Sequence, residues 1–332
     1  MGRNFKIAIV GTTGLVGRTF IKVLEERNFP VSNITFFASK NSAGKEIKFN
    51  GQNFIVEELK EETVKNYDFA LFSAGGAISK QYAPIFAQKK TIVIDNSSAW
   101  RMDENVPLVV PEVNPEDLSW HNNIIANPNC STIQLIVALK PISDNFGLNK
   151  VIVSTYQSIS GAGQKGLDKY HKEMLGQDVG DKHKIFSNAF FHPVSAEQQD
   201  WTVEEIKMIN ETRKMLHNPN LPISVTCVRL PFEVGHSETV YIETEKDFQK
   251  SDLIEKLNTQ ENLIIIDDLH KDDYPTPAMT QDKDEVFVGR IRKELSINNA
   301  FWMWVVANNI RKGAATNAIQ IAEKMIEMNL IN

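Results

Sequence analysis

Residues 6–17 read Lys6-Ile7-Ala8-Ile9-Val10-Gly11-Thr12-Thr13-Gly14-Leu15-Val16-Gly17 and decide the fold. The first five are a short apolar run typical of a buried strand, and apolar residues at helical spacing begin at Val16. The glycines therefore lie in the turn between a first strand and a first helix. Glycine lets the backbone approach a pyrophosphate, which the helix N-terminus holds with its N–H groups and dipole. The stretch predicts a dinucleotide-binding turn; an ordinary tight turn is the alternative.

Three further apolar runs end in small or polar residues, at 34–38, 68–76 and 91–98. Because helical stretches alternate with them, they predict a parallel sheet with helices on both faces. A ligand of such a sheet lies across the carboxyl ends of its strands. We therefore expect Ser73 and Gly75 to face a cofactor.

The segment after the second strand, residues 39–45, indicates which dinucleotide binds. An NAD enzyme usually has an acid here to accept the ribose 2′-OH. This chain has two lysines and no acid there, in Ser39-Lys40-Asn41-Ser42-Ala43-Gly44-Lys45. The segment favours NADP, with Lys40 as a charge for the 2′-phosphate. A polar loop with solvated lysines is the alternative, because no arginine fork is present.

Composition restricts the class of protein. The chain has 332 residues, which predicts two domains, and 36 Lys and Arg against 42 Asp and Glu give a net charge of −6. This balance argues against nucleic acid as a partner. No apolar run approaches a membrane span and no signal peptide is evident, so we expect a cytoplasmic protein without a membrane partner. Cys130 and Cys227 are the two cysteines, and no His or Cys spacing indicates a metal site.

Cys130 stands at a strand-to-helix junction, between the apolar runs 124–126 and 133–139. Asn129 or Ser131 can cap the helix. A helix N-terminus favours the thiolate, which is the nucleophilic form of cysteine. A small buried core residue is the alternative, and a nucleophile also needs a base supplied from elsewhere.

The second half of the chain predicts a largely antiparallel sheet. Strand-like runs lie at 151–156, 224–230, 237–244, 286–291 and 301–306. Residues 157–163 form a loop of small residues between them, and a final helix from Gly313 to about Met328 could pack back on the first domain. The fold class is α/β, with a Rossmann-like dinucleotide-binding domain and a second α+β domain.

Several charged residues of the second half are candidate ligand contacts. Arg229 lies on a strand in an apolar run and needs an anionic partner. His236 follows a glycine at a strand start, where we expect it to be exposed. Thr202 and Glu205 form a capping box that opens a helix, on which Glu204 and Lys207 share a face. A solvated surface pair is the default interpretation of those two charges.

Five segments, taken in order, closely resemble the aspartate-β-semialdehyde dehydrogenase family. They are the glycine turn, Asn127-Pro128-Asn129-Cys130-Ser131-Thr132, residues 157–163, Arg229 with 235–237, and residues 311–315. The resemblance is to the shorter, Gram-positive-type branch, whose members are homodimers. It implies an NADP-binding domain of residues 1–130, completed by helix 313–332, and a catalytic and dimerisation domain of residues 131–312.

The resemblance also implies roles for single residues. Cys130 matches the acylated nucleophile, His236 the acid/base, Gln157 the residue that positions substrate, and Arg229 the residue that binds its carboxylate. Glu204 matches the contact to the substrate amino group, and Arg101, Lys207 and Asn129 match the phosphate site. The matched cofactor contacts are Gly11, Thr13, Gly14, Leu15, Val16, Lys40, Asn41, Ser42, Ser73, Gly75, Ser160, Gly161 and Asn309.

One position departs from the family pattern. Asn41 stands where the family usually has an arginine for the 2′-phosphate, so some use of NAD is expected beside NADP. The implied reaction reduces L-aspartyl-4-phosphate to L-aspartate 4-semialdehyde through a Cys130 thioester. The alternatives are another phosphorylating dehydrogenase, such as N-acetyl-glutamyl-phosphate reductase or glyceraldehyde-3-phosphate dehydrogenase, and a non-catalytic NADP-binding paralogue. A nucleophile together with its base argues against the last.

Overall fold

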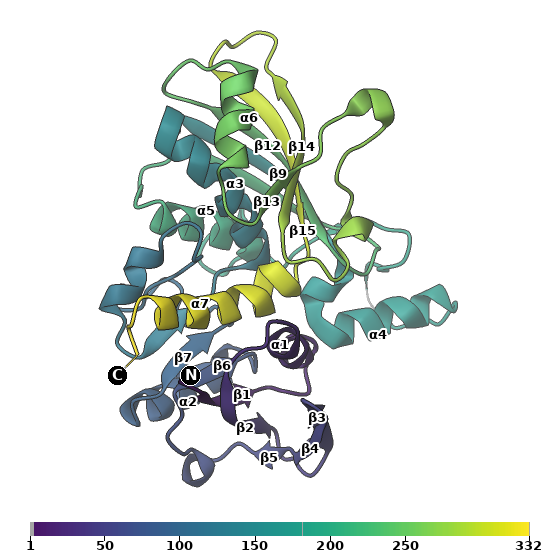
Figure 1. The fold of residues 1–332 in the computed structure, drawn as a ribbon. Helices are drawn as coiled ribbons and strands as arrows, with labels where there is room; N and C mark the ends of the chain where they lie inside the picture. Colours follow the sequence, from purple (N-terminus) through teal and green to yellow (C-terminus); the bar gives the residue numbers. More distant parts are fainter. Residues whose placement is uncertain (1–2, 181, 332) are drawn as a thin grey trace. The chain divides into compact units, whose positions relative to one another are not determined.

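The computed structural model describes residues 3–180 and 182–331. The chain forms two compact units (Figure 1). One contains the chain up to Pro128 together with the C-terminal segment from Ala314, and the other is Asn129–Gly313.

The first unit is built on a six-stranded parallel sheet of order β5-β2-β1-β6-β7-β8. Its strands are β1 (Phe5–Val10), β2 (Val31–Ala38), β5 (Glu57–Glu58), β6 (Phe69–Phe72), β7 (Ile92–Asp95) and β8 (Ile124–Ala126). Its helices are α1 (Leu15–Glu26), α2 (Gly76–Gln88) and α7 (Thr316–Glu327), with 3₁₀ turns at Glu61–Thr63 and Pro115–Trp120. The predicted parallel sheet is confirmed. Sequence analysis missed the β3–β4 hairpin (Glu46–Phe49 and Gln52–Ile55), an amphipathic pair that follows the glycine at position 44.

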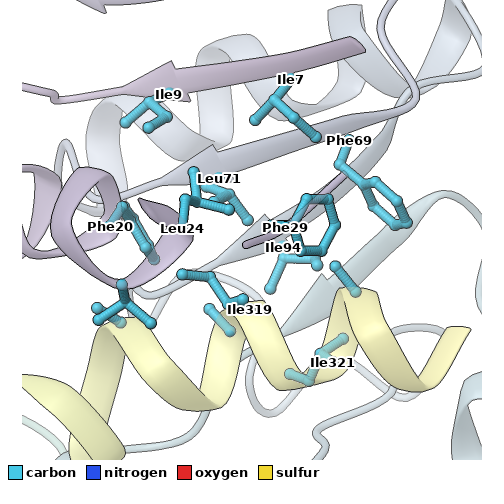
Figure 2. Close-up of a cluster of buried hydrophobic side chains, with 14 of the residues drawn as sticks. Ile7, Ile9, Phe20, Leu24, Phe29, Phe69, Leu71, Ile94, Ile319 and Ile321 are labelled. Carbon is cyan, nitrogen blue, oxygen red and sulfur yellow. The ribbon is translucent and has the colours of Figure 1, made fainter. Parts of the chain in front are cut away.

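Helix α7 belongs to this unit although it ends the chain. Its apolar side joins α1 and the strands in one core, in which Phe20 and Leu24 of α1 and Ile319 of α7 are buried. Figure 2 shows Ile319 pointing from α7 toward Leu24 and Leu71. Helix α7 thus packs on the first unit, because its apolar stripe needs a face to cover.

The second unit contains a seven-stranded mixed sheet of order β10-β11-β9-β12-β15-β14-β13. Its strands are β9 (Lys150–Gln157), β10 (Phe190–Phe191), β11 (Ile223–Arg229), β12 (His236–Glu243), β13 (Leu263–Ile265), β14 (Val286–Lys293) and β15 (Ala300–Ala307). Four of its neighbouring pairs are antiparallel, while β11–β9 and β13–β14 are parallel. A largely antiparallel sheet was expected, and the two strands that flank residues 230–235 are separated by β9 rather than paired with each other.

Helices α3 (Cys130–Phe146), α5 (Val203–Met215) and α6 (Lys250–Asn258) pack on this sheet. The remaining elements are η3 (Ile159–Ala162), α4 (Gly163–Met174), 3₁₀ turns at Leu269–Lys271 and Pro277–Thr280, and a π-helical turn at Arg311–Ala315. Helix α3 continues through Pro141 to Phe146. One prediction needs correction: the segment expected as a loop at residues 157–163 contains a 3₁₀ turn that leads into α4.

Candidate active site

Three candidate residues form one row across the second sheet. In register, Gln157 of β9 lies opposite Arg229 of β11 on one side and His236 of β12 on the other. All three are buried, and His236 is 0% exposed. The expectation that His236 is exposed is wrong, because β9 and β15 flank its strand.

Gly161 packs against this row. A Cβ at position 161 would lie 2.5 Å from Nη1 of Arg229 and 3.1 Å from Nε2 of His236. Arg229 is also held from behind, because its Nη1 donates to the carbonyl of Ser158 at 2.6 Å. The absence of a side chain at Gly161 is therefore what lets the guanidinium and the imidazole occupy these positions.

Helix α3 begins at Cys130, as the strand-to-helix prediction expects. Asn129 is its N-cap, and the side-chain oxygen accepts from the N–H groups of Ser131 and Thr132 at 3.0 and 3.3 Å. Cys130 is partly exposed, whereas Cys227 is buried. Burial raises the pKa of the Cys227 thiol, which suits a core residue. Of the two thiols, Cys130 is thus the accessible one.

A hydrogen-bond network joins the start of α3 to α5 and β9. The Asn129 side chain donates to Glu204 at 2.8 Å, and Gln157 donates to the hydroxyl of Ser131 at 2.8 Å. Burial raises the pKa of Glu204, but Lys207, His192 and the bond from Asn129 outweigh it and lower the pKa to about 2. Glu204 is therefore a buried anion rather than one half of a solvated surface pair. Lys207, 3.4 Å from it, is the more exposed partner.

The tautomer of His236 follows from its surroundings. The backbone N–H of Ser158 donates to Nδ1 at 3.1 Å, so Nδ1 carries no proton and the neutral ring carries it on Nε2. Burial, with the charge of Arg229, lowers the pKa of His236 to about 3. Nε2 is buried without a protein partner among the described residues, as is Oε1 of Gln157. Two polar atoms left this way in one row indicate a ligand site.

His192 joins the site, and sequence reasoning missed it. It follows β10, which pairs with the end of β11 and brings the ring to 3.5 Å from Nη2 of Arg229. Burial lowers its pKa to about 4, with Glu204 opposing and Arg229 assisting. No sequence motif marks this residue, because only the two-residue pairing of β10 puts it there.

The predicted cofactor contacts of the second unit also cluster. Asn309 accepts from the backbone N–H of Gly235 at 3.0 Å and donates to the hydroxyl of Ser160 at 3.0 Å. Its side chain thus ties the turn before His236 to the turn that contains Gly161. Both turns lie at the end of the sheet where the row of Arg229, Gln157 and His236 lies.

The first unit holds the glycine turn at the carboxyl ends of β1 and β6. Gly11 has φ +87°, and a Cβ there would lie 2.8 Å from the carbonyl carbon of Ser73. Gly14 is the N-cap of α1, and no side chain caps the helix there. The helix therefore begins, at Leu15 and Val16, at a turn open to a phosphate. This cradle fits a dinucleotide pyrophosphate.

Ser42, in the segment that follows β2, lies beside that turn. The hydroxyl of Thr13 is 3.5 Å from the hydroxyl of Ser42, while Lys40 and Asn41 are exposed. Ser73 donates to the carbonyl of Gly11 at 3.5 Å, and Gly75 has φ +87° at the start of α2. The structure therefore brings the predicted contacts of the first unit to one end of its parallel sheet.

Arg101 lies in the first unit and is 7% exposed. Its guanidinium donates to the carbonyls of Asn96 and Asn127, at 2.7 and 3.0 Å. Arg101 is therefore a buried cation whose guanidinium is oriented by two backbone carbonyls.

Among the residues that the structure describes, no three His, Cys, Asp or Glu side chains gather closely enough to hold a metal ion. In the same residues no helix has the length and apolar character needed to cross a membrane.

Comparison with known proteins assigns both units. Residues 6–121 match the semialdehyde dehydrogenase NAD-binding domain, and residues 139–312 match the semialdehyde dehydrogenase dimerisation domain. The aspartate-semialdehyde dehydrogenase of Aquifex aeolicus is 51% identical, over 99% of this chain and 100% of its own length. The chain belongs to the aspartate-semialdehyde dehydrogenase family. The Bacillus subtilis member is 47% identical over the full length of both chains.

Solved structures of the family agree. Aspartate semialdehyde dehydrogenase II of Vibrio cholerae has a TM-score of 0.92 at 41% identity, covering 98% of this chain and 99% of its own. A second crystal structure of that enzyme, complexed with ASA, matches with the same TM-score at 40% identity.

Proposed function

We propose that this chain reduces L-aspartyl-4-phosphate to L-aspartate 4-semialdehyde with NADPH and releases phosphate. The observation that carries the proposal is the buried row of Arg229, Gln157 and His236, which Gln157 links to the Cys130 helix through Ser131. The product is a precursor in the biosynthesis of lysine and diaminopimelate, threonine, methionine and isoleucine. The first unit is the NADP-binding domain, and the second is the catalytic and dimerisation domain.

The substrate's two charged groups match two opposite charges of the site. Arg229 is a buried cation for the α-carboxylate, and Glu204 is a buried anion for the ammonium group. Gln157 donates to Glu204 at 3.4 Å and keeps its carbonyl oxygen for substrate. Arg101, Lys207 and Asn129 are assigned to the phosphate that leaves.

The Cys130 sulfur is the nucleophile. It lies close enough to Arg229 for the thiolate charge to raise the pKa of that guanidinium, in opposition to the dominant lowering by burial. Attack on the acyl carbon forms the C–S bond and breaks the bond to phosphate, which leaves a thioester. Backbone N–H groups of the first turn of α3 stabilise the oxyanion. The Nε2–H of His236 donates a hydrogen bond to the thiolate and later to the thiohemiacetal oxyanion. This oxyanion expels the Cys130 thiolate as the aldehyde forms, so the neutral ring keeps its proton.

NADPH supplies the hydride that reduces the thioester. Gly11, Thr13, Gly14, Leu15, Val16, Ser73 and Gly75 would hold it in the first unit, and Ser160, Gly161 and Asn309 in the second. Lys40, Asn41 and Ser42 would meet the 2′-phosphate. Because Asn41 offers no charge, we expect measurable turnover with NAD as well.

A homodimer in the cytoplasm is the working form that we propose. Residues 139–312 match a dimerisation domain, and both cysteines are free thiols. A nucleophilic thiol is retained in a reducing compartment.

The test is phosphate-dependent reduction of NADP, and separately of NAD, by L-aspartate semialdehyde. Cys130→Ala should abolish turnover, while Cys227→Ala, the matched control at the other cysteine, should keep most of it. Full turnover in Cys130→Ala would refute the thioester mechanism. Reduction with glyceraldehyde 3-phosphate or N-acetyl-glutamate semialdehyde, but not with aspartate semialdehyde, would replace the proposed substrate.

A further inference from the structure

A cavity of about 460 Å³ lies in the first unit, between α1 and the start of β3. Thr12 and Thr13 of the glycine turn line it at the end where α1 begins. Four basic side chains line it against two acidic ones, namely Arg18, Lys22, Lys45 and Lys48 against Glu25 and Glu46. The excess of positive charge favours an anion as its ligand. None of these six side chains has a role in the function proposed above.

Arg18 contacts the glycine turn directly. It is the fourth residue of α1, it is exposed, and its Nη1 donates to the carbonyl of Thr13 at 2.6 Å. The guanidinium therefore lies back over the turn that precedes the helix. A cation this close to a helix N-terminus opposes the helix dipole, and no acidic residue stands in the first turn of α1 to offset it. The charge of Arg18 thus does not stabilise α1 and instead adds to the positive field at the turn.

Lys45 reaches the same cavity from the other side. It directly precedes β3, and its carbonyl accepts from the N–H of Val56 at 2.9 Å, while the N–H of Gly44 donates to the carbonyl of Val56 at 2.9 Å. The N–H of Lys45 also donates to the carbonyl of Ser42 at 3.4 Å. These backbone bonds fix the point from which the lysine side chain leaves the chain, close to Ser42.

The two cations flank a pair of hydroxyl groups. The hydroxyl of Thr13, whose carbonyl accepts from Arg18, is 3.5 Å from the hydroxyl of Ser42, whose carbonyl accepts from Lys45. Here α1 begins and the chain leaves β2. A bound dinucleotide places its pyrophosphate at that helix start and its adenosine ribose at the end of that second strand. The 2′-phosphate of NADP, which the ribose carries, is therefore expected beside these hydroxyls, at the end of the cavity that holds Arg18 and Lys45.

We propose that Arg18 and Lys45 select NADP over NAD by holding the 2′-phosphate in this cavity, beside Thr13 and Ser42. Arg18 offers a planar group of donors and Lys45 a point charge, which together replace the charge that Asn41 lacks. The inference rests on the proposed function, because it specifies how the cofactor of that reaction is recognised. Recognition of the 2′-phosphate can be measured without turnover.

The experiment is calorimetric titration with adenosine 2′,5′-bisphosphate and with adenosine 5′-monophosphate, which differ only in the 2′-phosphate. The wild type should bind the bisphosphate more tightly. Arg18→Gln and Lys45→Gln should each reduce that preference about tenfold or more, with Kd for the monophosphate within about twofold. Both side chains are exposed, so the variants should fold.

Lys22→Gln is the matched control. Lys22 lines the same cavity one helical turn beyond Arg18, where its Nζ lies 3.7 Å from a carboxylate oxygen of Glu26. Its replacement should change the preference less than about twofold, because a charge farther from the ribose is screened by solvent and salt. An equal loss of preference in Lys22→Gln would show a general effect of charge and overturn the inference. So would an unchanged preference in both Arg18→Gln and Lys45→Gln.

Two further outcomes test the ligand itself. If Lys40→Gln removes the preference while Arg18→Gln does not, the chain directly after β2 holds the 2′-phosphate and the inference is wrong. Inorganic phosphate is the other source of the same chemistry, and it should not displace the bisphosphate at millimolar concentration. Displacement at micromolar phosphate, lost in Arg18→Gln, would assign the cavity to free phosphate and also overturn the inference.

Steady-state rates separate this inference from the proposed function. Arg18→Gln and Lys45→Gln should each lower the ratio of kcat/KM for NADP to that for NAD about tenfold, with KM for the semialdehyde unchanged. Semialdehyde activity with a wild-type ratio in both variants would overturn the role of Arg18 and Lys45 alone. A 2′-phosphate preference that Arg18→Gln removes, in a protein without semialdehyde activity, would overturn the proposed function alone.

Discussion

His236→Asn tests the electrostatics of the site through stability rather than through rate. The folded protein keeps His236 neutral, since burial and the charge of Arg229 lower its pKa to about 3. The unfolded chain binds a proton with a pKa of about 6.5. The contribution of the neutral ring to stability is therefore complete above pH 6.5 and is lost as pH falls below it.

The magnitude follows from these two values. At about pH 5 the unfolded histidine is protonated and the folded one is not, which costs about 1.4 kcal/mol for each pH unit below 6.5. His236 should therefore account for about 2 kcal/mol of the fall in unfolding free energy between about pH 7.5 and 5. Any folded pKa below about 4 leaves that figure nearly unchanged, because the unfolded value sets the onset.

The assay is urea unfolding at the two pH values, at one protein concentration. His236→Asn should reduce the difference between them by about 2 kcal/mol, whatever its effect on stability at either pH. His270→Asn, at an exposed histidine, is the control and should leave the difference unchanged. If His236→Asn shows the same difference as the wild type, the ring is protonated in the folded state and the assigned tautomer is wrong.

Three other substitutions probe single contacts. Gly161→Ala should raise KM for the semialdehyde about tenfold or more in steady-state assays, because its Cβ would lie 2.5 Å from Nη1 of Arg229; an unchanged KM would contradict the carboxylate role. Gly313→Ala places a Cβ 2.9 Å from Cβ of Cys130, so kcat and the rate of Cys130 alkylation should both fall about tenfold, and normal alkylation would argue against displacement of the sulfur. Asn41→Arg should lower KM for NADP and leave KM for NAD unchanged, as measured by initial rates with each cofactor; no change for NADP would mean that the 2′-phosphate is held elsewhere.

Local patterns were sufficient to predict most elements of the fold. The glycine turn, the strand-to-helix junction at Cys130 and the capping box of Thr202 and Glu205 are short-range features, and the structure contains all three. The capping box is complete, with Thr202 and Glu205 each bonded to the other's backbone. Such features can be predicted because backbone geometry and a few neighbouring side chains determine them.

Local patterns could not predict which side chains are buried. His236 looked exposed after Gly235, and Glu204 with Lys207 looked like a surface pair, because strand order and helix packing decide which face is covered. His192 had no signal at all, since a two-residue pairing of β10 with β11 brings it to Arg229.

By itself, the sequence determined the two kinds of sheet, the position of Cys130 at a helix start and the family resemblance. These depend on residue type and on spacing along the chain. Only the tertiary structure decided that β9 lies between β11 and β12, which aligns Arg229, Gln157 and His236 in one buried row. Sequence alone could not give this alignment, because register between distant strands is set by packing of the whole unit and not by any one segment.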